Sequence, residues 1–297
     1  MPLRRSGPAR RKVATAGTLV SLLTVLALPL ALPGSATATD AAKTPAHPDA
    51  AKTPAHPDAD WMGSTIALHE GGDRAGGIEP RASFHRRGVA GVDVSSHNRH
   101  VSWWSLRRSG VRFAYVKATE GINYTNPYFA HQYRGSYHAG MIHGAYHFAL
   151  PDHSSGATQA RYFANHGGDW SRDGRTLPGA LDMEYNPYGS TCYGKSARGM
   201  VNWIHDFVRA YREETGRDPV IYTSTNWWKR CTGNSGRFGR SNPLWIPRYG
   251  SSVGALPGGW QYHSIWQHTS SGHPVGDRNR FNGSYSRLKV LAYGDDD

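Results

Sequence analysis

The pattern of apolar and polar positions between about residues 88 and 293 alternates between two periods. Short runs rich in β-branched residues predict strands, at residues 89–94, 111–117, 142–148, 177–182 and 220–223. Segments of helical period between them predict helices, at residues 102–109, 126–139, 154–165 and 200–211. The last helix has the clearest signature, because apolar residues recur at helical spacing up to Tyr211 and Gly216 then follows.

This order of elements predicts an α/β fold. Strands that alternate with helices at this spacing run parallel and are joined by right-handed crossovers. After residue 223 the helical pattern fades, and residues 244–248, 264–268 and 280–281 predict short strands joined by loops rich in Gly and Pro. We therefore expect an irregular TIM-like barrel with about five β/α units, followed by three strands with few helices.

Acidic residues stand where several predicted strands end. Asp93 ends the first strand, Glu120 follows the second, Asp182 and Glu184 end the fourth, and Asp277 lies beyond a late strand. In such a barrel the loops after the strands carry the active site, so these side chains would converge on one rim. Asp182 and Glu184 would share a strand face, with Cα atoms roughly 6.5 Å apart. An Asp-x-Glu by itself also fits a solvated strand end or an ion pair, and the other strand-end acids favour the site.

Such a rim has the groups that glycoside hydrolysis requires. A carboxylic acid protonates the leaving oxygen, and a negative group stabilises the oxocarbenium-like centre. Carboxylates that lie close together keep one of them protonated near neutral pH. The candidate substrate-binding residues near the same strand ends are Tyr146, Lys117, Glu120, Phe148, Tyr185 and Trp266.

Four motifs in a fixed order carry a family resemblance. They are Gly-Val-Asp-Val-Ser-Ser at residues 91–96, Tyr-Val-Lys-Ala-Thr-Glu-Gly at 115–121, Gly-Ala-Tyr-His-Phe at 144–148 and Leu-Asp-Met-Glu-Tyr at 181–185. Together they resemble the family 25 glycoside hydrolases, which are N-acetylmuramidases, and in particular the secreted single-domain type. The resemblance implies an irregular barrel that hydrolyses the β-1,4 bond between N-acetylmuramic acid and N-acetylglucosamine in peptidoglycan, with no cofactor and no metal.

The resemblance also implies a role for each acid. Glu184 matches the general acid, Asp182 the residue that stabilises the substrate's acetamido group or attacks directly, and Asp93 and Asp277 the supporting carboxylates, while Tyr146 matches an aromatic residue that lines the cleft. Members of the family resemble retaining enzymes whose nucleophile is the substrate's own 2-acetamido oxygen. Our hypothesis is that Glu184 protonates the leaving oxygen and later activates water, while Asp182 stabilises an oxazolinium-like intermediate. Direct attack by Asp182 is the alternative.

The first 87 residues lie outside this resemblance. Residues 1–38 have a basic start, a short apolar core and a small-x-small end, which predicts a secretory signal peptide and an extracellular protein exported by the Sec or the twin-arginine route. Residues 39–60 form a Pro-rich linker in which residues 41–49 are repeated at 50–58. Residues 61–87 are a spacer or a removable pro-segment, residues 88–293 the catalytic domain, and residues 294–297 an acidic tail.

The charge of the chain bears on its partners. The formal net charge of +12 falls to +7 without the leader, so the mature protein stays basic and is attracted to an anionic cell envelope. A basic surface also attracts nucleic acid, but no nucleic-acid motif accompanies it. We expect a monomer that acts on cell-wall peptidoglycan, without nucleic acid and without stable membrane association.

Cysteine and histidine suggest competing chemistries. Cys192 and Cys231 are the only cysteines, and in an exported protein they predict a disulfide, since no His-paired context supports a catalytic thiol. His143 and His147 would share a strand face but lack the spacing typical of zinc ligands. A chitinase or endo-N-acetylglucosaminidase is the nearest enzymatic rival, although the longer run of alternating acids typical of chitinases is absent. A non-catalytic wall-binding lectin is disfavoured by the four acids.

Overall fold

Residues 54–71, 88–272 and 275–294 are described by the computed structural model of the chain. The predicted signal peptide, most of the predicted linker and the acidic residues after Gly294 lie outside these ranges. Within them, no helix has the length and apolar character needed to cross a membrane.

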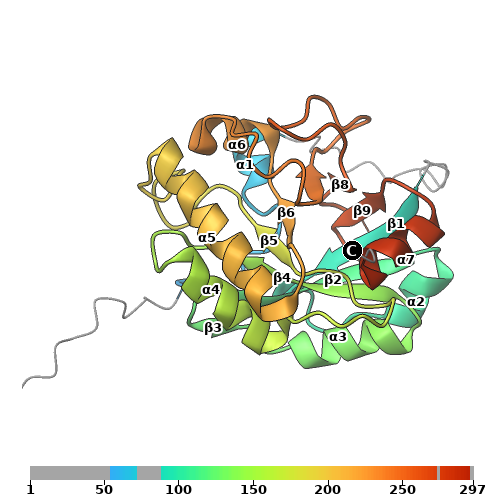
Figure 1. Ribbon diagram of the computed structural model, residues 1–297. Coiled ribbons are helices and arrows are strands. Elements are labelled where there is room, and N and C mark those ends of the chain that lie inside the picture. The colour runs from blue at the N-terminus through green and yellow to red at the C-terminus, as the bar shows by residue number, and fades with distance from the viewer. Residues whose placement is uncertain (1–53, 72–87, 273–274, 295–297) are drawn as a thin grey trace, which may run out of the picture. The chain divides into compact units, whose positions relative to one another are not determined.

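The strands of the described residues form one sheet that closes into a barrel (Figure 1). They are β1 (Val89–Val94), β2 (Phe113–Glu120), β3 (Tyr124–Thr125), β4 (Ile142–Phe148), β5 (Ala180–Asp182), β6 (Val220–Tyr222), β7 (Leu244–Pro247), β8 (Ile265–Thr269) and β9 (Arg278–Phe281). The order is β1-β9-β8-β7-β6-β5-β4-β2-β3, and a parallel pairing of β1 with β2 closes the barrel and leaves β3 outside. β9 runs antiparallel to both of its neighbours, β1 and β8. The irregular TIM-like α/β barrel predicted from the sequence is confirmed.

Alternation along the strands separates an inner from an outer apolar layer. Phe113 and Tyr115 of β2 belong to the cluster inside the barrel, whereas Ala114 and Val116 pack outward with helix residues. The first family motif serves this packing, because a Cβ on Gly91 would lie 2.2 Å from the Phe113 ring. The strand side chains that fill the interior include Ile142, Tyr146, Ala180, Val220, Tyr222, Trp245, Ile265 and Phe281.

Helices cover the outside of the first two thirds of the barrel. They are α2 (Trp103–Arg108), α3 (Phe129–His138), α4 (Gly156–Phe163) and α5 (Ala197–Thr215), with short helical turns η2 (Ser96–Asn98) and η3 (Ala164–Gly168). α4 and α5 pack against each other, as Figure 1 shows. Ser155 and Ser196 cap the two helices by accepting a backbone N–H, as expected for Ser at this position.

Helix α3 begins later than the sequence predicts. The sequence predicts a helix from residue 126, but the side chain of Asn126 accepts the Tyr128 N–H at 2.9 Å and donates to the Lys117 carbonyl at 2.8 Å. These bonds hold Asn126 in a turn after β2, and the helix starts at Phe129.

Two further helices are α6 (Thr225–Thr232), which lies where the sequence predicts a loop, and α7 (Tyr285–Tyr293), which follows the last predicted strand. α6 contains weak helix formers such as Thr225 and Asn226. Its cap is nevertheless regular, because the Ser224 hydroxyl accepts the Trp227 N–H, and Trp227 and Trp228 are buried. Burial of two large side chains therefore outweighs a weak local propensity.

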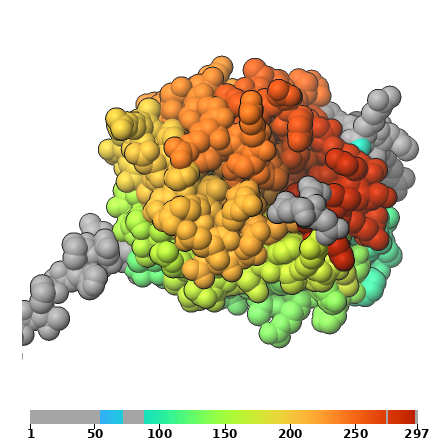
Figure 2. Space-filling model, viewed as in Figure 1, coloured from blue at the N-terminus to red at the C-terminus, as the bar shows by residue number. Residues whose placement is uncertain are grey.

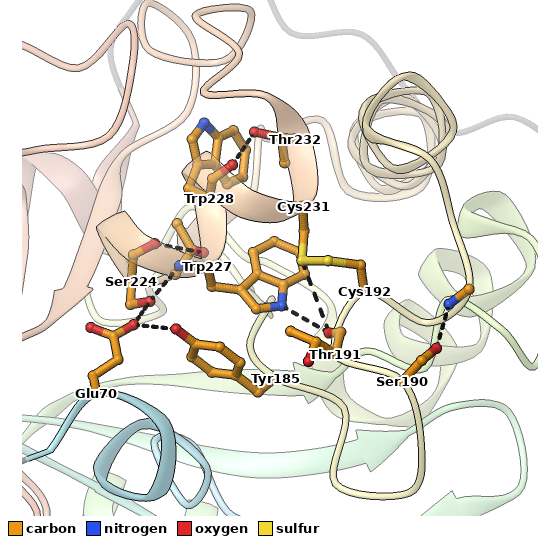
Figure 3. Close-up of a disulfide and its surroundings, with 12 residues drawn as sticks. Glu70, Tyr185, Ser190, Thr191, Cys192, Ser224, Trp227, Trp228, Cys231 and Thr232 are labelled. Carbon is orange, nitrogen blue, oxygen red and sulfur yellow. Dashed lines mark hydrogen bonds between the residues drawn. A yellow bond between two sulfur atoms is a disulfide. The ribbon is translucent and has the colours of Figure 1, made fainter.

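The predicted disulfide between Cys192 and Cys231 is present, with Cα atoms 5.3 Å apart (Figure 3). It joins the loop after β5 to the last turn of α6, where the sequence had predicted a loop. A cross-link that closes a loop of this length stabilises the fold by about 4 kcal/mol in the chain-entropy account.

Candidate active site

Four carboxylates meet at the carboxyl end of the parallel strands. Asp93 lies near the end of β1, Asp182 ends β5, and Glu184 follows two residues later. Asp277 precedes β9, and because β9 is antiparallel its start lies at this same end, where its first residue pairs with Val92. All four side chains are buried, with at most 5% exposed.

The alternation of β5 directs Asp182 and Glu184 to the same side. Leu181 and Met183 belong to the outer layer, whereas Ala180 belongs to the interior. Asp182 and Glu184, at the intervening positions, therefore face the interior side of the rim. The sequence predicted this shared face, although β5 itself ends at Asp182.

Asp182 is the least satisfied of these groups. Neither of its carboxylate oxygens has a hydrogen-bond partner among the described residues. Burial and the neighbouring charge of Glu184 raise the pKa of Asp182 well above its ordinary value, and the charge of Lys117 lowers it in part. A buried carboxylate without partners is costly, so it is poised to interact with a bound molecule.

Glu184 is fully buried, and its pKa is raised to about 7. Burial is the largest cause, because it disfavours the charged form. Hydrogen bonds from Thr65 and Gly63 lower this pKa in part. Glu184 can therefore carry a proton near neutral pH, as a general acid must.

Asp93 is held by two side-chain amides. Gln267 and Asn279 donate to its Oδ2 atom at 3.0 and 2.7 Å, and burial still raises the pKa of Asp93 to about 7. The Trp245 indole N–H in turn donates to Asn279 Oδ1 at 2.9 Å. Burial, followed by the charges of Asp93 and Glu184, raises the pKa of Asp277 well above its ordinary value.

Lys117 and Glu120 form a buried ion pair beside the acids. Their Nζ and Oε2 atoms are 2.5 Å apart, and both side chains are fully buried. Lys117 Nζ also lies 5.1 Å from the centre of the Phe148 ring, and Glu120 Oε1 accepts the Tyr188 hydroxyl at 2.7 Å. The Lys117 ammonium therefore lies over the Phe148 ring, and its positive charge lowers the pKa of Asp182 in part.

The remaining predicted aromatic residues have different surroundings. Tyr146 is buried in the barrel interior, where its hydroxyl accepts the Met62 N–H at 3.2 Å. The Tyr185 ring is also buried and stacks on the His69 ring, with ring centres 4.1 Å apart. Trp266 packs in the outer layer and donates its indole N–H to the Arg248 carbonyl at 2.8 Å. Trp266 is therefore not brought together with the acids.

Gln267 takes the inward position next to Trp266 and was not among the predicted site residues. Its amide contacts Asp93 and accepts the Tyr222 hydroxyl at 2.8 Å. The alternation of β8 was the available signal, since Ile265 lies inside the barrel and Gln267 is two positions later. Asn279, also not selected, has the equivalent role on β9.

The histidines that invited a zinc hypothesis are used in packing. His147 lies between Thr119 and Gln159, with ring nitrogens at 2.8 and 2.9 Å from their oxygens, and His143 stacks on the Tyr133 ring. Burial lowers the pKa of both histidines to about 4. In the residues that the structure describes, no group of three or more His, Cys, Asp or Glu side chains is arranged to hold a metal ion.

Comparisons with known proteins agree with this geometry. Residues 92–277 match the family described as "Glycosyl hydrolases family 25". The chain is 48% identical over 210 residues to Lysozyme M1 of Streptomyces globisporus, and the matched region covers 69% of this chain and 71% of that protein. It is 47% identical over 210 residues to the N,O-diacetylmuramidase of Chalaropsis sp, and the matched region covers 69% of this chain and 100% of that protein.

Solved structures give the same result. The structure of the muramidase from Acremonium alcalophilum has a TM-score of 0.69 and 55% sequence identity, and covers 70% of this chain and 100% of that chain. The family 25 lysozyme from Aspergillus fumigatus has a TM-score of 0.68 and 48% identity, and covers 69% of this chain and 99% of that chain. The chain therefore belongs to family 25 of the glycosyl hydrolases.

Proposed function

We propose that this glycoside hydrolase is a lysozyme that cleaves the β-1,4 bond between N-acetylmuramic acid and N-acetylglucosamine in peptidoglycan. The observation that carries the proposal is the buried pair of Asp182 and Glu184 on one rim with Asp93 and Asp277. Similarity to proteins named as lysozymes and N,O-diacetylmuramidases supports the choice of substrate.

In the first step, Glu184 protonates the leaving glycosidic oxygen. The substrate's 2-acetamido oxygen attacks the anomeric carbon as that bond breaks, which gives an oxazolinium-like intermediate. Asp182 accepts a hydrogen bond from the acetamido N–H and stabilises the developing positive charge. The two carboxylate oxygens of Asp182 that lack protein partners support this assignment.

In the second step, the Glu184 carboxylate takes a proton from water, and the resulting hydroxide attacks the anomeric carbon from the face that the leaving group occupied. Two displacements retain the anomeric configuration. Asp93 and Asp277 act as supporting carboxylates, and the amides of Gln267 and Asn279 fix the orientation of Asp93.

Two measurements test this mechanism. Product stereochemistry followed by NMR should show retention at the anomeric carbon, and inversion would contradict both displacements. Peptidoglycan glycan in which the acetamido group next to the scissile bond has been deacetylated should resist hydrolysis. Cleavage of that substrate at the normal rate would instead indicate direct attack by Asp182.

The bond that is cleaved can be read from the products. Digested peptidoglycan is reduced with borohydride, and its muropeptides are analysed by mass spectrometry. A reduced muramic acid end is expected, whereas a reduced glucosamine end would indicate an endo-N-acetylglucosaminidase. A lectin would bind walls without lowering the turbidity of a cell-wall suspension.

We also propose that the protein is secreted and meets peptidoglycan outside the cell as a monomer. The basic, apolar and small-residue regions of residues 1–38 support export, and the net positive charge supports attraction to an anionic wall. N-terminal sequencing of protein recovered from culture medium tests export. Wall binding should weaken as salt is added, because the attraction is screened.

A further inference from the structure

Residues 54–71, predicted as the end of a linker and the start of a spacer or pro-segment, lie across the acidic rim. Four of them, Asp60, Met62, Thr65 and Ile66, are at most 4% exposed. Met62 packs with the interior of the barrel and Ile66 with the outer layer. Figure 1 shows the segment, with its helix α1 (Ile66–Glu70), in blue beside α6, and in Figure 2 later parts of the chain cover it from the same side.

The backbone of this segment is hydrogen-bonded to the proposed general acid. The Gly63 N–H donates to Glu184 Oε1 at 2.7 Å, and the Thr65 N–H donates to Glu184 Oε2 at 3.1 Å. The Thr65 hydroxyl also donates to Oε2. Both oxygens of Glu184 are thus engaged, and no glycosidic oxygen can approach them while the segment is in place.

The residues around Glu184 bind the same stretch of backbone. The Met62 N–H donates to the Tyr146 hydroxyl at 3.2 Å, and Gln267 donates to the Met62 carbonyl at 3.2 Å. The Tyr249 hydroxyl donates to the Gly63 carbonyl at 3.2 Å. The segment therefore satisfies polar groups of the cleft that a bound glycan would otherwise meet.

Lys117 holds the segment on the other side of the cleft. Its ammonium group donates to the carbonyls of Pro57 and Asp60 at 3.1 and 2.5 Å. The Tyr188 hydroxyl, whose proton is shared with Glu120, also lies within hydrogen-bond distance of the Asp60 carboxylate. The buried Lys117 ammonium is shared between Glu120 and two backbone carbonyls, so charge-assisted hydrogen bonds hold the segment in place.

Gly63 shows how closely the segment fits. Its φ is +90°, in the region that favours glycine. A Cβ at this position would lie 2.4 Å from the Tyr249 hydroxyl, 2.6 Å from Gln267 Oε1 and 2.8 Å from the Tyr222 hydroxyl. A bulky side chain at position 63 would therefore clash with the cleft and strain the backbone.

The end of the segment is anchored beside the disulfide (Figure 3). Glu70 accepts hydrogen bonds from the Tyr185 hydroxyl at 2.8 Å, from the Ser224 hydroxyl and from Asn226 at 3.0 Å. The His69 ring stacks on Tyr185 at 4.1 Å. Cys192 and Cys231 tie together the loop and the helix that supply these contacts.

One relative is matched over its whole length without such a segment. The 210 matched residues account for 100% of the Chalaropsis N,O-diacetylmuramidase, although they are only 69% of this chain. An N-terminal region of this length is therefore an addition to a complete family barrel. Its contacts are concentrated on the groups to which catalysis and substrate binding are assigned.

We propose that residues 54–71 are an intramolecular competitive inhibitor of the active site, so that the full chain is a zymogen. Displacement or removal of the segment gives the active enzyme. Because the segment is tethered to the barrel, its effective concentration at the cleft is on the order of millimolar. This inference rests on the proposed lysozyme function only because one of its tests measures the rate of peptidoglycan hydrolysis.

The test compares the full chain with variants of the segment. Gly63→Leu should release the segment and raise the initial rate of peptidoglycan hydrolysis by about 10-fold or more, since a tenfold change corresponds to one or two lost polar contacts. Glu70→Ala, which removes the anchor without steric conflict, should raise the rate to a smaller extent. Leu68→Ala is the matched control, because Leu68 is 75% exposed, and it should leave the rate unchanged.

Hydrogen exchange of the Met62–Ile66 amides provides a readout that does not depend on turnover. Exchange should be slow in the full chain and in Leu68→Ala, and fast in Gly63→Leu. Measurable hydrolysis at equal rates in the full chain and Gly63→Leu would overturn the proposal, as would exchange as fast in the full chain as in that variant. If every variant is inert while exchange differs as expected, the lysozyme function fails and the docking of the segment stands.

Discussion

Both ends of the barrel carry clusters of charged residues, but the two clusters differ in burial and in pairing. At the amino ends of β6, β7 and β8, a hollow of about 740 Å³ is lined by several arginines: Arg172, Arg212, Arg217, Arg240 and Arg287. Arg212 pairs with Asp218 at 2.7 Å, and the Arg217 guanidinium lies 4.8 Å from the centre of the Trp170 ring. At the carboxyl ends, the four acids are buried and their pKa values are raised.

This difference indicates where function resides. Partly solvated, paired charges such as Arg212 and Asp218 contribute little to stability and cost little. Buried acids without full partners destabilise the fold, and they are retained where the chemistry needs them. Substitution at the acidic end should therefore trade activity against stability, whereas substitution at the basic end should change neither by much.

The largest effect is expected at the proposed general acid. Glu184→Gln should lower turnover by roughly 100- to 10,000-fold while wall binding is kept, because the amide cannot donate a proton as an acid. The rate of peptidoglycan hydrolysis is measured in the Gly63→Leu background, so that the result does not depend on the docked segment. Glu213→Gln, at an exposed position of α5, is the control. Clearing of cell walls at the parent rate by Glu184→Gln would refute the role.

Asp182→Asn should separate activity from stability. We expect a loss of about 100- to 1,000-fold in hydrolysis, because one group that stabilises the transition state is lost. Since the pKa of Asp182 is raised in the folded state, its stabilising contribution is complete at acid pH and is lost as pH rises. The variant should therefore have a higher free energy of unfolding than the parent at pH 8, and the difference should be smaller at pH 5.

Urea unfolding at the two pH values measures this change. His143 and His147, whose pKa values are lowered to about 4, lose their stabilising contribution as pH falls below about 6.5, but they do so equally in both proteins and cancel in the difference. Asp169→Asn, at an exposed position, is the control. A variant that is equally destabilised at both pH values would contradict the account of Asp182 as an unpaired buried acid.

Removal of the disulfide tests how much it stabilises the fold at the acidic end of the barrel. Cys192→Ser with Cys231→Ser should lower the free energy of unfolding by about 2–4 kcal/mol, because the unfolded chain regains its freedom. The proposed inhibition should also weaken, since the bridge joins the segments that bind Glu70. Chemical denaturation and the initial rate of the full chain are the two measurements. Unchanged stability would show that the packing of α6 alone holds these segments.

The smallest effect is expected at the amino end. Arg212→Ala removes one exposed ion pair with Asp218 and should change the free energy of unfolding by less than about 1 kcal/mol. Hydrolysis of a short soluble peptidoglycan fragment should be unchanged. A large loss of activity on that fragment would show that the two ends of the barrel are not independent.

Much of the fold and half of the site were predictable from local patterns. The strand ends that carry Asp93, Asp182 and Glu184 follow from apolar runs and the residues that interrupt them. Asp277 was predicted on the rim because it lies beyond a late strand, and only its role came from the family resemblance. Its actual position depends on β9 running antiparallel, which the short, polar sequence of β9 does not indicate. Aromatic character predicts a substrate contact for Trp266, whereas the alternation of β8 directs Gln267 inward and Trp266 outward.

The sequence by itself determined the α/β order, the family motifs and the pairing of Asp182 with Glu184 on one face, because these depend on neighbours within a few residues. The tertiary structure alone decided that Gln267 and Asn279 hold Asp93, and that Gly63 and Thr65 engage Glu184. The contact between Gly63 and Glu184 joins residues 121 positions apart. Such pairs leave no mark on local periodicity, because only closure of the barrel brings its rim and the N-terminal segment together.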